Sequence, residues 1–246
     1  MDKYLVLDID ATLVHTHDAE DDPDKIEPMK KFEMLNIYSD EEKIKLRKKL
    51  YVLKIVDVVK PSGYGEITMM TGIYRPFLRV FLDYCQRNCA GIVIWSAGQK
   101  KYVEELVSKM FPYKSFQPLA IFTQEDCILI EDNEGTIVKK PLSKVYKDKR
   151  LKGKLNEKNT LALDDRDDTF SLNVKNGIQI PEFESDFSIE DISDHEDVAL
   201  LKLMSWMETK EFKECADVRK LRKDKIFEKT LEDYNKQLKS EKKKNK

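Results

Sequence analysis

Residues 4–14 read Tyr4-Leu5-Val6-Leu7-Asp8-Ile9-Asp10-Ala11-Thr12-Leu13-Val14, a short apolar run that ends in two acids and a threonine. The apolar, partly β-branched start predicts a buried strand. Alternate side chains of an extended chain share a face, so Asp8 and Asp10 converge at the carboxyl end of this strand, where open α/β sheets bind ligands. Two carboxylates in one place repel each other unless a cation or a proton separates them. Mg²⁺ suits carboxylate and carbonyl oxygens, so the pattern predicts a magnesium site.

The same pattern has two other interpretations. D-x-D-x-T could open a calcium loop of the EF-hand type, but that loop needs glycine at its sixth position and glutamate at its twelfth, where this chain has Leu13 and Ala19. The acids could also be a polar strand end without chemistry, because short motifs often occur by chance. The rest of the chain has to decide between a site and a polar strand end.

The composition is that of a globular protein of moderate size. The chain has 246 residues, of which 37% are charged and 9% aromatic, which suits one good-sized domain or one domain with an insertion. The net charge of −2 gives no global field that favours nucleic acid or a membrane. No apolar run approaches the roughly 20 residues of a membrane span, and no signal-peptide core precedes the first strand. The four cysteines form no strong framework, so we expect an intracellular protein, nuclear or cytoplasmic, with reduced thiols.

Residues 15–74 interrupt the α/β pattern and indicate an insertion after the first strand. The polar segment from His15 to Pro28 predicts an exposed loop, in which His15 and His17 are loop residues rather than metal ligands. Ser39 begins a capping box, which predicts a helix to about Leu50. Residues 51–59 and 66–71 then predict a hairpin around the turn at 61–65.

Regular α/β alternation resumes at Arg75-Pro76, which predicts the start of an amphipathic helix. Further strands are expected over residues 91–95, 119–122, 127–130, 136–139, 160–164 and 177–181. Three of the apolar strands end in an acid, a hydroxyl and a pair of acids, namely Asp8, Ser96 and Asp164-Asp165. The predicted fold is therefore α/β, with a mostly parallel sheet flanked by helices and the functional groups at one edge.

The segment from Asp8 to Val14 resembles the first motif of the haloacid-dehalogenase superfamily. More narrowly, it resembles the FCP/SCP-type (NLI-interacting-factor-like) phosphatases that act on the RNA polymerase II C-terminal tail. Further segments of the same resemblance follow in chain order: Arg75-Pro76, Ser96, Lys139-Lys140-Pro141-Leu142-Ser143, Asp164-Asp165 and Asp217-Val218-Arg219. Ser96 stands where the family more often has threonine, and Pro141 replaces an acid, which leaves Lys140 or Lys139 as the motif lysine. The resemblance covers residues 4–222 and implies a phosphatase domain over 1–228, an insertion at about 15–74 and a flexible, charged tail over 229–246.

The resemblance also implies roles for individual residues. Asp8 would attack phosphorus and become a phospho-aspartate, and Asp10 would act as general acid and base. Mg²⁺ would be held by Asp8, the backbone carbonyl of Asp10, Asp164 and Asp165. The phosphate would be bound by Thr12, Ser96, Ala97 and Lys140, although Thr12 is expected to orient the loop rather than to react.

The implied substrate is a phosphoserine or phosphothreonine peptide, plausibly the RNA polymerase II tail. Specificity would come from the insertion, whose hairpin carries apolar residues that could grip an extended peptide, namely Tyr51, Tyr64, Met69 and Met70. Two other functions are open. Relatives in mitochondrial protein import use this fold for binding with little catalysis, and a phosphatase of nucleic-acid ends is disfavoured by the nearly neutral charge.

Overall fold

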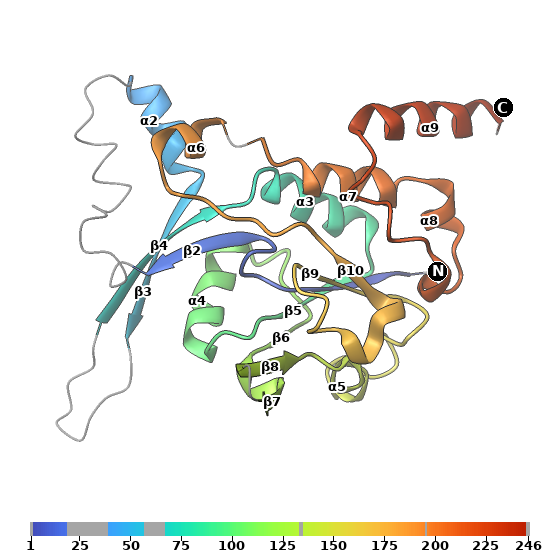
Figure 1. Cartoon of the computed structure of the whole chain (residues 1–246), viewed down its shortest axis with the longest axis horizontal. Coiled ribbons are helices and arrows are strands. Elements are labelled where there is room, and N and C mark those ends of the chain that lie inside the picture. Colours follow the sequence, from blue (N-terminus) through green and yellow to red (C-terminus); the bar gives the residue numbers. More distant parts are fainter. Residues whose placement is uncertain (1, 19–38, 57–66, 133–134, 195, 245–246) are drawn as a thin grey trace.

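The computed structural model describes residues 2–18, 39–56, 67–132, 135–194 and 196–244. Its centre is a five-stranded parallel sheet with the order β10-β9-β1-β5-β6 (Figure 1). The strands are β1 (Tyr4–Leu7), β5 (Gly91–Trp95), β6 (Ala120–Phe122), β9 (Thr160–Asp164) and β10 (Gly177–Gln179). The sheet confirms the predicted α/β class and places the first apolar strand at its middle.

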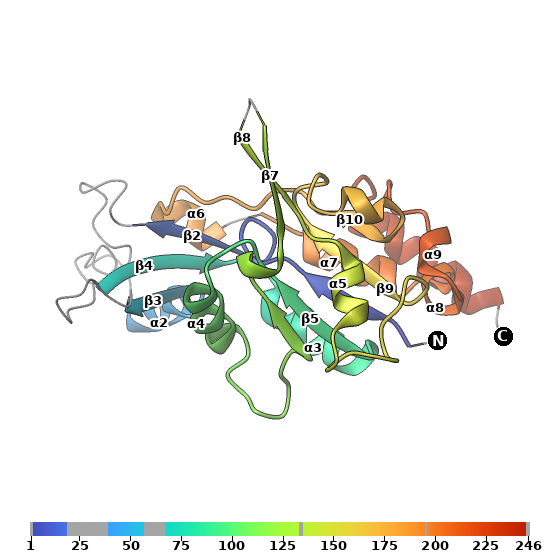
Figure 2. The same cartoon turned by 90° about the horizontal axis from the view of Figure 1, so that it is seen from below.

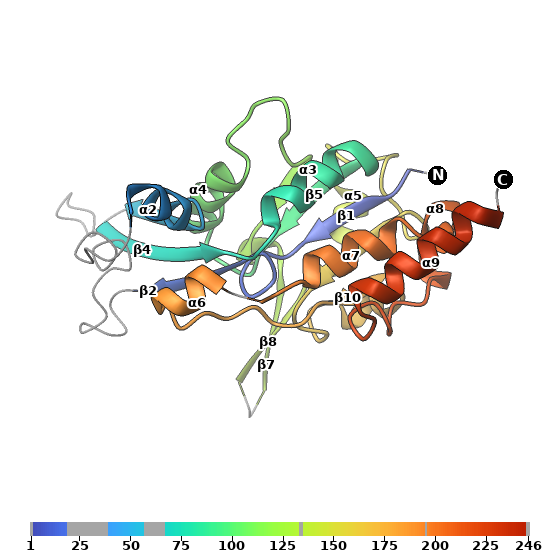
Figure 3. The ribbon, with the colours of Figure 1, turned by 90° about the horizontal axis from the view of Figure 1, so that it is seen from above.

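Both faces of the central sheet are covered, because the residues of β1 alternate between two cores. Leu5 and Leu7 pack on one face with helices α3 (Leu78–Asn88) and α7 (Ala199–Met207). Tyr4 and Val6 pack on the other face with helix α5 (Leu142–Lys147). Figure 2 and Figure 3 show these two faces from opposite sides. Fully burying a leucine such as Leu7 stabilises the fold by about 1.5–3 kcal/mol, so β1 is held from both sides.

A second sheet lies beside the first and is built from the segment after β1. Its antiparallel order is β2-β4-β3, with β2 (Val14–Asp18), β3 (Leu50–Val56) and β4 (Ile67–Tyr74). Helix α2 (Asp40–Arg47) precedes β3 and has the predicted capping box at Ser39. The hairpin prediction is confirmed for β3 and β4, while its turn at 61–65 lies outside the described residues.

The prediction of an exposed loop from His15 is wrong for its first residues. Val14–Asp18 forms β2, which pairs with β4 along its whole length. The strand carries polar side chains because it lies at the edge of the sheet, where His15 and His17 pack against the ring of Phe187 at 5.5 Å between centroids. The rest of the predicted loop, from residue 19 onward, falls outside the described residues.

The remaining elements surround this core. Strands β7 (Ile128–Asp132) and β8 (Gly135–Lys139) form a hairpin that projects from the molecule (Figures 2 and 3). The other helices are α4 (Lys100–Met110), α6 (Ile189–Asp194), α8 (Lys210–Glu214) and α9 (Leu231–Lys244), with short 3₁₀ turns at Gln124–Asp126, Ser171–Asn176 and Val218–Lys220. None of the helices in the described part of the chain is long and apolar enough to cross a membrane.

The segment 229–246, for which a flexible tail is predicted, contains a helix. Residues 231–244 form helix α9, which packs along α7 (Figure 3). The side chain of Tyr234 is fully buried, and its hydroxyl donates to the carbonyl of Ile226 at 2.9 Å. The many lysines of this helix lie around a narrow apolar stripe, which is why its composition suggested a solvated end.

Candidate active site

The predicted site residues lie at the carboxyl ends of three adjacent strands. Asp8 follows β1, Ser96 follows β5 and Asp164 ends β9, as parallel pairing of these strands requires. The backbone N–H of Asp8 donates to Leu163 at 2.9 Å, which continues the sheet pairing into the site. The backbone then turns sharply at Ala11, which has a φ of 55° and lies in the left-handed region.

A buried arginine stabilises this turn by hydrogen bonding to its backbone. Arg75 is 1% exposed, and its guanidinium donates to the carbonyls of Thr12 at 2.9 Å and Pro181 at 2.7 Å. Its charge is balanced by Asp197 at 2.7 Å. The sequence pattern marked Arg75 as a helix start but did not predict this contact with the catalytic loop. The local sequence indicates the burial of Arg75 only through its apolar neighbours.

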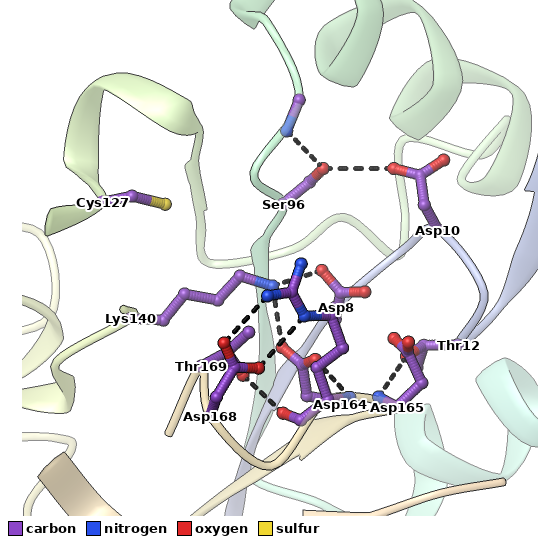
Figure 4. A network of polar contacts seen from close by, with 12 residues as sticks. Asp8, Asp10, Thr12, Ser96, Cys127, Lys140, Asp164, Asp165, Asp168 and Thr169 are labelled. Atoms are coloured by element: carbon purple, nitrogen blue, oxygen red, sulfur yellow. Dashed lines mark hydrogen bonds and ion pairs between the residues drawn. The ribbon is translucent and has the colours of Figure 1, made fainter. Parts of the chain in front are cut away.

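Lys140 lies between two of the predicted acids. Its ammonium bonds to Asp8 and, at 2.7 Å, to Asp164, and all three side chains are at least nine-tenths buried (Figure 4). Burial disfavours the charged form, but the two carboxylates outweigh it and raise the pKa of Lys140. Lys139 instead donates to the hydroxyl of Ser171 at 2.8 Å. The structure therefore identifies Lys140, and not Lys139, as the lysine of the site.

Three carboxylates meet beside this lysine. Oxygens of Asp8, Asp164 and Asp165 all lie within 4.8 Å of one another, and in the described residues no other acid, histidine or cysteine cluster of this kind is found. If every group is ionised, three carboxylates and the ammonium of Lys140 sum to −2, the charge that one divalent cation neutralises. Carboxylate oxygens are ligands that Mg²⁺ prefers, so the donor set fits the predicted metal. Burial raises the pKa of Asp8 and of Asp165, and the neighbouring charge of Asp164 adds to both rises.

Thr12 is directed at one of these acids. Its hydroxyl donates to the side chain of Asp165 at 3.0 Å and accepts from the backbone N–H of Asp165 at the same distance. Thr12 is fully buried, so both bonds are shielded from water. These contacts join the catalytic loop to the end of β9 and fit the expected orienting role better than direct phosphate binding.

The side chain of Asp10 lies apart from the three clustered carboxylates. Figure 4 shows its carboxylate on the side of Ser96, while Asp8 faces Lys140. One oxygen accepts from the hydroxyl of Tyr102 and the other from Ser96 at 3.3 Å. Burial raises the pKa of Asp10, and the hydrogen bonds from Tyr102 and Ser96 oppose that rise. No sequence motif predicted Tyr102 as a residue of the site.

The predicted phosphate-binding segment follows β5. The hydroxyl of Ser96 is buried and also accepts from the backbone N–H of Gly98 at 2.9 Å. Ala97 lies between these two residues, at the end of the strand where its backbone N–H was predicted to bind phosphate. The segment therefore lies beside Asp10, and Ser96 uses its only proton for that acid.

A groove of about 410 Å³ opens beside Asp10, between the second sheet and the start of α4. It is lined by Asp10, Thr16, Ile55, Thr68, Met70, Gln99 and Tyr102. Of the four hairpin residues predicted to grip a peptide, the structure brings only Met70 to this groove. Tyr51 is buried, Met69 alternates to the opposite face of β4, and Tyr64 lies outside the described residues.

The comparisons with known proteins agree with this fold. The structure is similar to that of the fission yeast RNA polymerase II CTD phosphatase Fcp1, an arginine-to-alanine variant bound to beryllium fluoride, with a TM-score of 0.52 and 18% identity over 74% of this chain and 42% of that chain. A second structure, of Fcp1 described as an essential RNA polymerase II CTD phosphatase, gives a TM-score of 0.51 and 20% identity with the same coverage. The chain thus spans less than half the length of these structures, with which it shares the fold. Comparison with curated proteins gives no match.

The family model of NLI interacting factor-like phosphatases matches residues 3–219. This range contains the whole central sheet, the second sheet and every residue of the site. The chain therefore belongs to the NLI interacting factor-like phosphatases.

Proposed function

We propose that this chain is a Mg²⁺-dependent phosphatase that hydrolyses phosphoserine or phosphothreonine in peptides through a phospho-aspartate on Asp8. The observation that carries the proposal is the position of Lys140 between Asp8 and Asp164, at the strand ends where the family's chemistry is expected. The ammonium of Lys140 opposes the rise that burial causes in the pKa of Asp8, and so favours the ionised carboxylate, which is the form that can attack phosphorus.

The first half-reaction would transfer the phosphoryl group to the enzyme. An oxygen of Asp8 attacks phosphorus, and the bond from phosphorus to the serine or threonine oxygen breaks. Lys140 and the N–H and O–H groups after β5 offset the charge on the phosphoryl oxygens, because phosphoryl transfer depends mainly on positioning and electrostatics. Asp10 gives a proton to the leaving oxygen, which for general acids is worth about 10²–10⁴-fold in rate.

The second half-reaction would release phosphate. Asp10, now ionised, takes a proton from a water molecule that attacks the phospho-aspartate, and the bond between phosphorus and Asp8 breaks. Its place beside the groove, apart from the clustered acids, suits a group that acts on the leaving oxygen and on water. Thr12 and Arg75 hold the loop that carries both acids.

Asp8, Asp164, Asp165 and the backbone carbonyl of Asp10 would hold the Mg²⁺. When bound, Mg²⁺ supplies a positive charge that stabilises the phosphoryl oxygens and balances the acids. The crowding of three carboxylates around a single lysine supports this assignment.

The substrate would approach along the groove beside Asp10. Its lining combines apolar groups of the second sheet with hydroxyl groups of Thr16 and Tyr102, which suits an extended peptide more than a compact metabolite. The related Fcp1 structures are described as RNA polymerase II CTD phosphatases. We therefore propose a polymerase-tail repeat as the first peptide to test.

The test is a substrate panel assayed with and without Mg²⁺. It contains phosphoserine, phosphothreonine and phosphotyrosine peptides, a polymerase-tail repeat and a 5′-phosphorylated oligonucleotide. We expect Mg²⁺-dependent release of phosphate from serine and threonine peptides, and none from an Asp8→Asn variant. Peptide binding without turnover would instead favour a binding module, and preferential hydrolysis of the oligonucleotide would favour a nucleic-acid-end phosphatase.

A further inference from the structure

Three hydroxyl groups form a chain that ends on Asp10. Tyr102, on α4, donates to one oxygen of the Asp10 carboxylate. The hydroxyl of Thr16, on β2, lies 2.6 Å from the hydroxyl of Tyr102 and 2.6 Å from that of Tyr51, on β3. The direct contact from Thr16 to Asp10 is 3.5 Å, too long to compete with these two bonds.

The chain of hydroxyls has a single consistent direction. The ionised carboxylate only accepts, so Tyr102 gives its one proton to an oxygen of Asp10, and the proton that a general acid carries on the other oxygen leaves this bond unchanged. Thr16 must then donate to Tyr102, and Tyr51 must donate to Thr16. Hydrogen bonds aligned head to tail polarise one another, so Thr16 and Tyr51 strengthen the bond that Tyr102 makes to the acid.

The second sheet has a glycine where the ring of Tyr51 must pass to reach Thr16. Across its three strands Thr16, Gly72 and Tyr51 occupy one register, with Gly72 in the middle. A Cβ at position 72 would lie 2.0 Å from the ring of Tyr51 and 2.1 Å from its hydroxyl. Because Gly72 has no side chain, the Tyr51 ring can lie across β4 and reach Thr16.

Under the proposed function, Tyr102 keeps its hydrogen bond to Asp10 when phosphate binds. Ser96 now donates its only proton to Asp10. If that proton turns to a phosphate oxygen, as the proposed function requires, Ser96 no longer holds the acid. A misplacement of about 1 Å can reduce a rate by about 100-fold, so a second anchor for the carboxylate has a large effect.

We propose that Tyr102 is a positioning residue for the general acid Asp10, and that Thr16 and Tyr51 hold it in place from the second sheet. The inference rests on the proposed function, because it assigns a role to the surroundings of that same acid. Its consequence is that the insertion contributes to the chemical step as well as to substrate binding.

The test compares leaving groups in single-turnover measurements of the first half-reaction, with the full chain and Mg²⁺. The probes are a phosphoserine peptide, whose alkoxide leaving group needs a proton, and p-nitrophenyl phosphate, whose leaving group does not. We expect Tyr102→Phe to slow the peptide reaction by about 10–100-fold, a part of the 10²–10⁴-fold that a general acid supplies, and the aryl reaction by less than about threefold. The matched control is Tyr84→Phe, which also loses one hydroxyl from a partly buried ring and a 2.7 Å bond, to Glu208, and should change neither rate.

Two further variants test the chain of hydroxyl groups and leave the residues at positions 102 and 10 unchanged. Thr16→Val removes the middle hydroxyl, and Gly72→Ala displaces Tyr51 while keeping every hydroxyl present. Each should slow the peptide reaction selectively but less than Tyr102→Phe does, and neither should add to the effect of Tyr102→Phe in a double variant.

The outcomes separate this inference from the proposed function. A wild-type chain that hydrolyses neither probe would overturn both. An active wild type in which Tyr102→Phe slows both probes equally, or neither, would overturn the positioning role alone. Additive effects in the double variants would overturn the part of the inference that concerns Thr16 and Tyr51.

Discussion

Replacing Lys140 by methionine tests whether its charge holds the site together. The variant keeps the length of the side chain and leaves Asp8 and Asp164, both buried, without their shared cation. Removing one partner of a buried ion pair costs about 3–5 kcal/mol of stability. For a chain of this size 1 kcal/mol corresponds to about 2–4 °C in melting temperature, so we expect a loss of about 6–20 °C in EDTA at neutral pH.

The loss should depend on pH with a defined sign. Burial raises the pKa of Asp8 above its ordinary value of 3.8, and Lys140 opposes that rise. Without Lys140 the pKa of Asp8 rises further, so the folded variant binds a proton that the unfolded chain has released. Protonation relieves the repulsion between the acids. The difference in melting temperature between wild type and variant should therefore shrink as the pH falls from neutral towards about 4.

Thermal unfolding followed by circular dichroism at several pH values provides the measurement. The control is Lys139→Met, which removes a neighbouring lysine. The ammonium of Lys139 donates to the hydroxyl of Ser171 rather than to a carboxylate. If Lys140→Met lowers the melting temperature no more than Lys139→Met does at neutral pH, the argument from buried charge is refuted. A difference that grows at low pH would refute the assigned sign.

Three further predictions concern catalysis. Asp8→Asn should fold normally but lose all turnover, and measurable phosphate release by a folded variant would exclude Asp8 as the nucleophile. Asp164→Asn and Asp165→Asn should each raise the Mg²⁺ concentration needed for half-maximal activity, which a Mg²⁺ titration after EDTA treatment measures; unchanged titration curves would contradict the metal assignment. Met70→Ala should lower kcat/KM for a phosphopeptide but not for a small aryl phosphate. Met69→Ala, on the opposite face of β4, should change neither value. Equal effects of the two variants would show that the groove does not select the substrate.

The position of the acids could be predicted from the sequence because it follows from two simple rules. Apolar runs of four or five residues mark buried strands, and parallel strands bring their carboxyl ends to one edge. Asp8, Ser96 and Asp164 each end such a run, so their meeting needed no knowledge of loops. The same two rules predict that Asp164 and Asp165 lie near the first motif.

Lys140 could not be assigned with the same certainty, because it follows a hairpin rather than a strand of the central sheet. Lys139 is the last residue of β8 and Lys140 follows it, and the sequence does not say which of the two side chains faces the site. The structure decides the question through the bond from the backbone N–H of Lys140 to the carbonyl of Thr169, at 2.6 Å, which fixes the end of the hairpin against the loop after β9.

The edge strand β2 and the lysine-rich helix α9 are the elements whose packing could not be predicted from the sequence pattern. β2 has no apolar alternation to detect, because it lies at the edge of its sheet and its polar side chains pack on Phe187 or contact the site, as Thr16 does. In α9 the apolar stripe is narrow, and Tyr234 alone is fully buried. Both segments are stabilised by contacts distant in sequence, which local propensity does not contain.

The residues around Asp10 show why an apolar pattern can conceal part of an active site. Tyr102 satisfies the periodicity of a core helix, and Tyr51 that of a strand, so neither was predicted to contact the acids of the site. In the fold their rings do pack, but their hydroxyls point along one line to Asp10. Arg75 anchors the catalytic loop on one side, and Tyr102 anchors its acid on the other. The second anchor depends on Thr16 and Tyr51, so under the proposed role of Asp10 as general acid the second sheet takes part in positioning that acid.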